Sequence, residues 1–244
     1  MDSRVMDIDC YSQQGSARET NRDFVGLFEL DCGVLVYLLD VSTSSSLNCA
    51  SFVEQLNGLI LERVTNESVA DPSLFLEVFQ QVIIELQQSF KSGVASLITC
   101  FVSYESGNVW GYTVGDSRIG TMKDEIIWLS PVHTGANPFG ESFIDSMKLL
   151  PERHILTRSL NMRKKYNPEL FQFNIAKEQS LVVASDGFWA ELTSELQLSL
   201  LAKQQVQTED DSSVIAIKDF IGAANLNCTV LSGNCNYFNL TNKG

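Results

Sequence analysis

The sequence contains no apolar run close to the roughly 20 residues that a membrane-spanning helix needs. Residues 1–9 are acidic and lack the apolar centre of a secretory signal peptide. We therefore expect a cytoplasmic protein. At 244 residues, with 44% apolar content and no internal repeat or linker, the chain is expected to form a single domain over residues 1–244.

Positive charge and histidine are scarce. Lys and Arg number 17 against 30 Asp and Glu, which gives a formal net charge of −13. Such a surface repels phosphate backbones and anionic lipids, so we expect no nucleic-acid partner and no membrane partner. The six cysteines include no Cys-x-x-Cys pair and are expected to be reduced. His133 and His154 stand isolated and are interpreted as ordinary loop or surface residues.

Strand-forming segments follow one another through short turns. Apolar patterning predicts strands over residues 5–11, 24–30, 33–39, 96–103, 109–114, 170–176, 180–185 and 213–217. Hairpins are expected within 24–39, within 96–114, at 123–125, and between 170–176 and 180–185. Residues 131–155 are irregular, which suggests a functional or mobile loop.

Helices are predicted over residues 49–64, 72–90 and about 192–206. The second has an N-cap aspartate, Asp71, followed by proline at the first helical position. Because the strands are joined by hairpins and the helices are grouped, the pattern predicts antiparallel sheets with helices on the outside.

Aspartates recur at the ends of the predicted strands. Asp40 and Asp186 each end a buried strand, while Asp23 begins a strand and Asp210 precedes one. A carboxylate at the end of a buried strand is costly without a cation, and no Lys or Arg lies between residues 177 and 203 to serve Asp186. A bound metal ion could take that role. The alternative for Asp186 alone is a turn-forming Asp-Gly pair.

If the sheets bring these four aspartates together, mutual repulsion raises their pKa values unless a divalent cation lies among them. Carboxylates, a backbone carbonyl and water suit Mg²⁺ or Mn²⁺, whereas Zn²⁺ prefers His and Cys. Two such ions could orient a hydroxide for attack on phosphorus, with an arginine holding the phosphate.

Six segments occur in an order that resembles the motif order of a known family. Residues 15–23 resemble G-x-x-R-x-x-N-E-D, and residues 39–41 occupy the place of D-G. Residues 114–118 are V-G-D-S-R unchanged, and residues 156–160 resemble L-T-R-x-L. Residues 184–189 resemble S-D-G-x-W, and residues 210–214 resemble D-N-x-[ST]-V. The family is the metal-dependent Ser/Thr protein phosphatases, also called PPM or type 2C-like. The resemblance covers about residues 8–218 and leaves 219–244 unassigned. The compact length and Ser42 favour a bacterial-type member.

The resemblance implies an α+β fold, a four-layer α-β-β-α sandwich of two antiparallel sheets flanked by helices. It also implies a signalling phosphatase that hydrolyses phosphoserine and phosphothreonine by attack of a metal-bridging hydroxide. The implied partner is a phosphorylated protein, opposing a Ser/Thr kinase, and the enzyme is expected to be a monomer. In the implied catalytic set, Arg18 would bind the substrate phosphate. Two Mn²⁺ or Mg²⁺ ions would be held by Asp23, Asp40, Asp186 and Asp210, together with the carbonyl of Val41. Asp116 would join Asp186 at a third ion.

Several positions depart from the family pattern. Arg22 replaces a glutamate, which would put a cation beside a metal ligand. Residues 40–44 lack the glycines of D-G-x-G-G, which changes the backbone freedom of this loop. Ser42 stands where some members carry a histidine proposed as general acid. Ala190 replaces an acidic residue, which puts the third ion in doubt.

The alternative function is a catalytically weak or inactive pseudophosphatase that binds phosphoproteins or other partners. Four retained aspartates and Arg18 favour an active enzyme, because a decayed site has no physical reason to keep clustered like charges. The altered 40–44 loop favours the alternative. A cysteine-dependent phosphatase needs the motif Cys-x5-Arg, and none of the six cysteines has an arginine six positions further along. The sequence also contains no G-x4-G-K-[ST] phosphate loop and no H-R-D kinase segment. Ser117 and Ser185 lack a nearby histidine for a serine-nucleophile mechanism.

Overall fold

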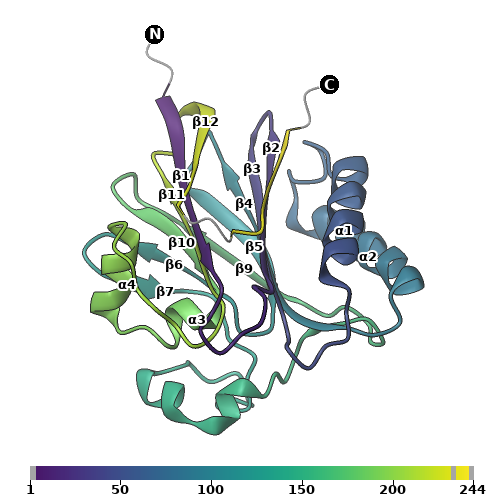
Figure 1. Ribbon diagram of the computed structural model, residues 1–244. Coiled ribbons are helices and arrows are strands. Elements are labelled where there is room, and N and C mark those ends of the chain that lie inside the picture. The colour runs from purple at the N-terminus through teal and green to yellow at the C-terminus, as the bar shows by residue number, and fades with distance from the viewer. Residues whose placement is uncertain (1–3, 232–234, 242–244) are drawn as a thin grey trace.

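Two stacked β-sheets with helices on both outer faces form the centre of the structure (Figure 1), a computed structural model that describes residues 4–231 and 235–241. Helices α1 (Cys49–Arg63) and α2 (Pro72–Ser89) cover one sheet. The short helices α3 (Asp186–Trp189) and α4 (Ser194–Leu201) cover the other. The expected order of layers, α-β-β-α, is therefore present.

The first sheet has six strands in the order β12-β1-β11-β10-β6-β7. Their bounds are β1 Arg4–Gln13, β6 Arg118–Met122, β7 Ile126–Trp128, β10 Ser180–Ala184, β11 Ser212–Lys218 and β12 Ala223–Val230. The second sheet has seven strands in the order β13-β2-β3-β4-β5-β9, with β8 paired to β4. Their bounds are β2 Asp23–Leu30, β3 Gly33–Val41, β4 Val94–Ser103, β5 Asn108–Val114, β8 Leu160–Asn161, β9 Glu169–Asn174 and β13 Tyr237–Thr241.

Both sheets are mixed, so the prediction of purely antiparallel sheets is wrong. The two exceptions are the C-terminal strands: β12 pairs in parallel with β1, and β13 pairs in parallel with β2. Because β11 runs antiparallel to β1, a strand that follows β11 by chain reversal runs in the direction of β1. The reversal uses Asp219 and Gly222, both with positive φ. The segment left unassigned from sequence thus adds an edge strand to each sheet.

The predicted hairpin between residues 170–176 and 180–185 is also wrong. Strand β9 pairs with β5 in the second sheet, whereas β10 pairs with β6 and β11 in the first. The short connection therefore crosses between sheets. Phe171 and Leu181 meet in the same core from opposite sides. Two consecutive strands that face the same core can be joined as a hairpin within one sheet or as a connection between two sheets. Both arrangements give the same apolar pattern, so the sequence did not distinguish them.

Three apolar layers hold the elements together. One lies between α1, α2 and the second sheet, one between the two sheets, and one between the first sheet and α3, α4. Asp71 caps α2 as predicted, since its carboxylate accepts from the amides of Ser73 and Leu74. The third predicted helix is shorter than expected and is represented by α4. Within the described ranges, no helix has the length and apolar character needed to cross a membrane.

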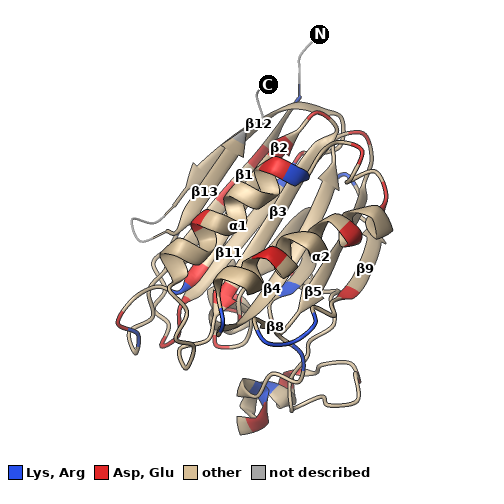
Figure 2. Ribbon diagram, turned by 90° about the vertical axis from the view of Figure 1, so that its right-hand side faces the viewer, with Lys and Arg blue, Asp and Glu red and all other residues tan. Residues whose placement is uncertain are grey.

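The irregular segment 131–155 contains two 3₁₀ turns, η1 (Asp145–Leu149) and η2 (Pro151–His154). In Figures 1 and 2 this part of the chain lies below the ends of the sheets, apart from the main body. Arg118 anchors it: the guanidinium lies 5.5, 5.8 and 5.0 Å from the ring centroids of Trp128, Phe143 and Trp189. Burial lowers the pKa of Arg118 to about 10. Cation–π contact with three rings compensates for that burial.

Candidate active site

The strand register brings the predicted aspartates to one end of the sandwich. Asp23 and Asp40 are directly opposite in the β2–β3 pair. Asp116 follows the end of β5, and Asp186 follows the end of β10. Asp210 comes two residues before β11, whose Val214 is paired with Ala184 at the end of β10. Chain segments that are distant in sequence therefore converge here.

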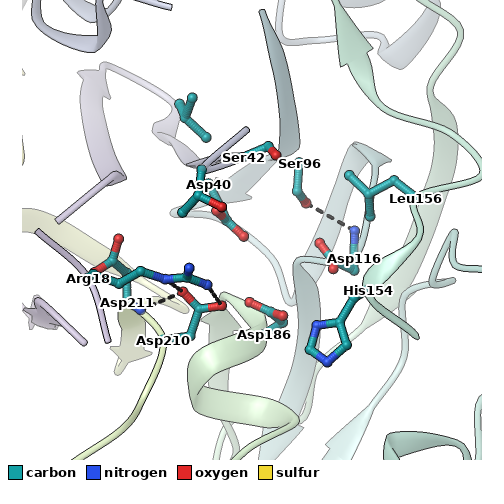
Figure 3. Close-up of a pocket in the computed structure, with 12 residues that line it drawn as sticks. Arg18, Asp40, Ser42, Ser96, Asp116, His154, Leu156, Asp186, Asp210 and Asp211 are labelled. Atoms are coloured by element: carbon teal, nitrogen blue, oxygen red, sulfur yellow. Dashed lines mark hydrogen bonds and ion pairs between the residues drawn. The ribbon is translucent and has the colours of Figure 1, made fainter. Parts of the chain in front are cut away.

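A cavity of about 160 Å³ opens at this end (Figure 3). It is lined by Arg18, Asp40, Val41, Ser42, Thr43, Ser96, Asp116, His154, Leu156, Asp186, Asp210 and Asp211. Figure 3 shows Asp186 between the Arg18–Asp210 pair on one side and Asp116 with His154 on the other. Asp23 does not line the cavity. Its carboxylate is buried behind it, with the residue 1% exposed.

The carboxylates are electrostatically unfavourable in the absence of a cation. Burial, followed by the charges of neighbouring aspartates, raises the pKa of Asp40 well above its ordinary value. Burial also raises the pKa of Asp23 and of Asp186, and it raises the pKa of Asp116 to about 8. One carboxylate oxygen of Asp23 and one of Asp116 are buried without a hydrogen-bond partner. Such oxygens are exceptions that require an explanation.

Two arginines occupy the cationic positions beside the aspartates. Arg18 donates from both Nε and Nη2 to the two oxygens of Asp210, with Nε 2.5 Å from Oδ1. Arg153 in η2 places Nη1 3.2 Å from Oδ2 of Asp186, and both side chains are 11% exposed. The local sequence offered no partner for Asp186. The structure supplies one from the 131–155 segment.

Asp211 holds the loop that carries Arg18. Its carboxylate accepts from the amide of Gly15 at 3.0 Å and from the amide of Arg22 at 2.8 Å. A side chain at Gly15 would not fit, because its Cβ would lie 2.3 Å from the carbonyl carbon of Asp210. Glu191 supports the same region by accepting from the amides of Glu209 and Asp210. This carboxylate is therefore engaged in holding backbone.

The Arg22 side chain extends toward the glycine-free loop after β3. Its Nη2 donates to the carbonyl of Ser45 at 3.0 Å and its Nη1 to that of Thr43 at 3.4 Å. Ser42 and Ser44 share a further hydrogen bond between their hydroxyls. Two departures from the family pattern are therefore in contact, since the arginine that replaces glutamate fixes the loop that lacks glycine.

Ser96 fixes the backbone turn that presents Asp116. Its hydroxyl accepts from the amides of Asp116 and Ser117 at 3.0 and 2.8 Å. Gly115 has a φ of +109°, and a Cβ there would lie 2.5 Å from the Ser96 hydroxyl. Trp189 completes the turn by donating from Nε1 to the carbonyl of Asp116 at 2.9 Å. The V-G-D-S-R segment thus needs glycine at this position for both its backbone conformation and its close packing.

The carboxylate oxygens at this site are the type of ligand that Mg²⁺ or Mn²⁺ prefers. Two of them, one on Asp23 and one on Asp116, are buried without a hydrogen-bond partner. Across residues 4–231 and 235–241, however, no three His, Cys, Asp or Glu side chains form a group that could hold a metal ion in the arrangement seen. Asp210 is paired with Arg18 and Asp186 with Arg153. Arg18 engages both oxygens of Asp210 and Arg153 engages one oxygen of Asp186, so these arginines compete with a metal ion for the two carboxylates.

Four residues that shape the site were given no place in it from sequence: Asp211, Arg153, Ser185 and His154, which was interpreted as an ordinary loop or surface residue and lines the cavity. Ser185 donates to Oδ2 of Asp23 at 2.7 Å and accepts from the amide of Ser213, which ties β2 to β10 and β11. The run of aspartates at 210–211 was a signal for Asp211. Nothing local to Arg153 or His154 signals their place, because a long irregular segment brings them there.

No model of a known protein family matches the sequence, and no curated protein matches it. Solved structures do match. The serine/threonine phosphatase of S. agalactiae is 18% identical with a TM-score of 0.69, covering 88% of this chain and 99% of that one. The PPM Ser-Thr phosphatase of Mycobacterium smegmatis, solved in complex with cacodylate, is 21% identical with a TM-score of 0.65 and the same coverage.

A third match is the catalytic domain of the serine threonine protein phosphatase PstP, solved in complex with two manganese ions. It is 17% identical with a TM-score of 0.60, covering 88% of this chain and 98% of that one. At such identities the likeness concerns the fold, and it spans nearly the full length of the matched chains. The chain has the fold of the bacterial PPM-type serine/threonine phosphatases.

Proposed function

We propose that the protein is a metal-dependent phosphatase that hydrolyses phosphoserine and phosphothreonine in proteins. The observation that carries the proposal is the convergence of five aspartates from both sheets on one cavity, four of which have raised pKa values: Asp40, Asp116, Asp186 and Asp211, with Asp210 as the fifth. Clustered buried carboxylates are a costly arrangement unless a function uses them. The fold shared with the phosphatases favours the same conclusion.

Asp23, Asp40, Asp186 and Asp210 are the proposed ligands of two Mn²⁺ or Mg²⁺ ions, together with the carbonyl of Val41. When bound, such ions supply Lewis acidity and an activated water for attack on phosphorus. Asp116 is the proposed ligand of a third ion with Asp186. Ser185 orients Asp23, and Ser96 orients Asp116 through the backbone.

Arg18 is the proposed phosphate-binding residue. Its guanidinium lines the cavity and already forms a two-point contact with a carboxylate, the geometry with which arginine also binds phosphate. In binding substrate it would exchange Asp210 for the phosphate oxygens. The structure offers no histidine at residue 42 to protonate the leaving oxygen, and Ser42 at the cavity wall lacks the acidity for that role.

The second candidate is a pseudophosphatase that binds a partner without turnover. The observation that favours it is the occupation of two carboxylates by arginines, with no ready metal-binding group among the described residues. The two candidates differ in one property. In an enzyme, metal ions compete successfully with the arginines for these carboxylates, whereas a pseudophosphatase keeps the arginine pairs.

Hydrolysis of a phosphothreonine peptide, measured with Mn²⁺, with Mg²⁺ and with chelator, distinguishes the candidates. We expect metal-dependent turnover that Asp186→Asn reduces by a factor of about 100 or more, on the scale of lost metal-ion catalysis. Asp124→Asn, in the exposed turn between β6 and β7, is the matched control and should retain activity. Absence of turnover in the parent protein at saturating Mn²⁺ would rule out the enzyme.

A further inference from the structure

His133 lies directly behind the turn that presents Asp116. Its place in the sequence suggested an ordinary loop or surface residue. It does lie in a loop, but it is buried, with 6% of its surface exposed. Its backbone amide donates to the carbonyl of Gly115 at 2.9 Å, and its ring nitrogen Nδ1 accepts from the amide of Gly115 at 3.2 Å. Both polar backbone groups of Gly115 are therefore bonded to one residue.

The turn between β5 and β6 depends on partners outside these two strands. Ser96 accepts from the amide of Asp116, as Figure 3 shows, and Trp189 donates to the carbonyl of Asp116. Together with the two bonds between His133 and Gly115, these contacts satisfy all four polar backbone groups of Gly115 and Asp116. Because Gly115 is buried and a buried amide without an acceptor is costly, loss of the imidazole should open the turn.

The ring of His133 must carry its proton on Nε2 to make these contacts. Nδ1 can accept from an amide only when Nδ1 itself is unprotonated. Nε2 lies 3.1 Å from Oε2 of Glu169 in β9, and a carboxylate oxygen accepts from an N–H group. Burial lowers the pKa of the His133 imidazole, which favours the neutral ring. The contacts at the two ring nitrogens therefore select the same tautomer.

Arg158 and Thr157 hold the other end of this arrangement. Arg158 donates from Nη1 to the same Oε2 of Glu169 at 2.9 Å, and the amide of Thr157 donates to the carbonyl of His133 at 3.0 Å. Both belong to the 156–160 segment, which resembles a family motif but has no part in the proposed function. The outer side of this arrangement faces a cavity of about 190 Å³, and the side chains of Arg158 and Glu169 are 46% and 43% exposed. Substitution of Glu169 should therefore leave the core packing intact.

We propose that His133 is a positioning residue for Asp116, with its ring tautomer fixed by Glu169. The functional meaning of this role rests on the proposed function, in which Asp116 is a ligand of a third ion. Loss of the imidazole removes the acceptor of the Gly115 amide and loosens the turn that presents the carboxylate. Loss of the Glu169 carboxylate leaves the imidazole in place but allows the second tautomer, in which Nδ1 carries the proton and cannot accept.

The tautomer can be measured on the parent protein by ¹⁵N NMR after labelling of its histidines. His133 and His154 are the two histidines of the chain, and the signals missing in His133→Asn identify the ring of interest. At neutral pH without metal, we expect Nδ1 of His133 to be unprotonated and Nε2 to carry the proton. Glu169→Ala should give a mixture of tautomers, whereas the matched control Glu178→Ala, in the exposed turn before β10, should not. A proton on Nδ1 in the parent protein would overturn the proposal.

Amide hydrogen exchange measures the turn itself. His133→Leu and His133→Asn are nearly isosteric variants, but only asparagine offers an oxygen in the place of Nδ1. We expect the amides of Gly115 and Asp116 to exchange at least about tenfold faster in His133→Leu than in the parent, and His133→Asn to recover most of the protection. The amide of Leu35 in β3 reports unfolding of the whole core and should change by less.

Equal exchange of the Gly115 amide in His133→Leu and the parent, or equal loss of protection in His133→Leu and His133→Asn, would overturn the proposal. Rates that rise equally at Gly115 and Leu35 would do so as well, because they would give His133 a general packing role. Both measurements use the metal-free protein. Failure of Mn²⁺ binding or of turnover would therefore contradict the proposed function and leave this test of His133 unaffected.

Discussion

Replacing Asp116 by asparagine should stabilise the metal-free protein, and should do so more strongly as pH rises. The residue is 6% exposed, one of its oxygens has no partner, and burial raises its pKa from 3.8 to about 8. A carboxyl whose pKa is raised on folding binds its proton more tightly in the folded state. Stability is therefore lost as pH rises from the unfolded value toward the folded value, and the penalty is complete above about pH 8.

The magnitude follows from that shift. A change from 3.8 to about 8 corresponds to roughly 6 kcal/mol if it is fully expressed. Part of the shift belongs to the repulsion between Asp116 and Asp186, and the structure around a charged Asp116 can relax. We therefore expect Asp116→Asn to raise the free energy of unfolding by about 2 kcal/mol at about pH 8.5 and by less than half of that at about pH 5.

Urea unfolding in chelator at the two pH values measures this gain. Asp145→Asn is the matched control, because Asp145 is exposed and its pKa is lowered by the hydrogen bond from Lys148. It should give no gain at either pH. A gain for Asp116→Asn that does not change with pH, or a loss at about pH 8.5, would refute the reasoning.

Three further substitutions test separate contacts. Arg153→Ala removes the guanidinium beside Asp186 and should tighten Mn²⁺ binding about three- to tenfold in calorimetry, whereas Arg153→Lys should change it less. Arg22→Ala should destabilise the protein by about 1–2 kcal/mol in urea unfolding, because the carbonyls of Thr43 and Ser45 lose their hydrogen-bond donor. Unchanged stability would mean that the loop after β3 does not depend on these hydrogen bonds. Asn236→Ala should cost about 1–2 kcal/mol by the same assay, since its side chain donates to the carbonyls of Asn21 and Asp23 at 2.9 and 3.0 Å; a neutral result would show that β13 does not support the site.

The sequence predicted the parts of the fold that depend on local pattern. The α2 cap at Asp71, both long helices, the β2–β3 hairpin and the turn between β6 and β7 follow from periodicity and turn residues. The pairing of β9 and β10 with different sheets does not, because both strands face the same core and the connection fits either arrangement. The parallel pairing of β12 and β13 likewise depends on which sheet edge is open, a property of the folded structure.

The site was predictable to a similar extent. Positions beside predicted strands indicated Asp40, Asp186 and Asp210, and the motif order added Arg18 and Asp116. All five line one cavity. Their roles as ligands stay predictions. The contacts of Arg153 and Arg22 could not be predicted, because each depends on how an irregular segment packs against a distant one. Even so, the structure changes the interpretation of Arg22, whose side chain donates to the loop after β3.

Calorimetric titration with Mn²⁺ most directly tests whether these aspartates bind metal. We predict that Mn²⁺ binds with release of protons, detected as a heat that depends on the ionisation enthalpy of the buffer, because carboxyls with raised pKa values must lose protons to bind a cation. Asp186→Asn should weaken this binding strongly, whereas Asp124→Asn should not. Absence of Mn²⁺ binding, or binding that Asp186→Asn leaves unchanged, would contradict the assignment of this end of the sandwich as a metal centre.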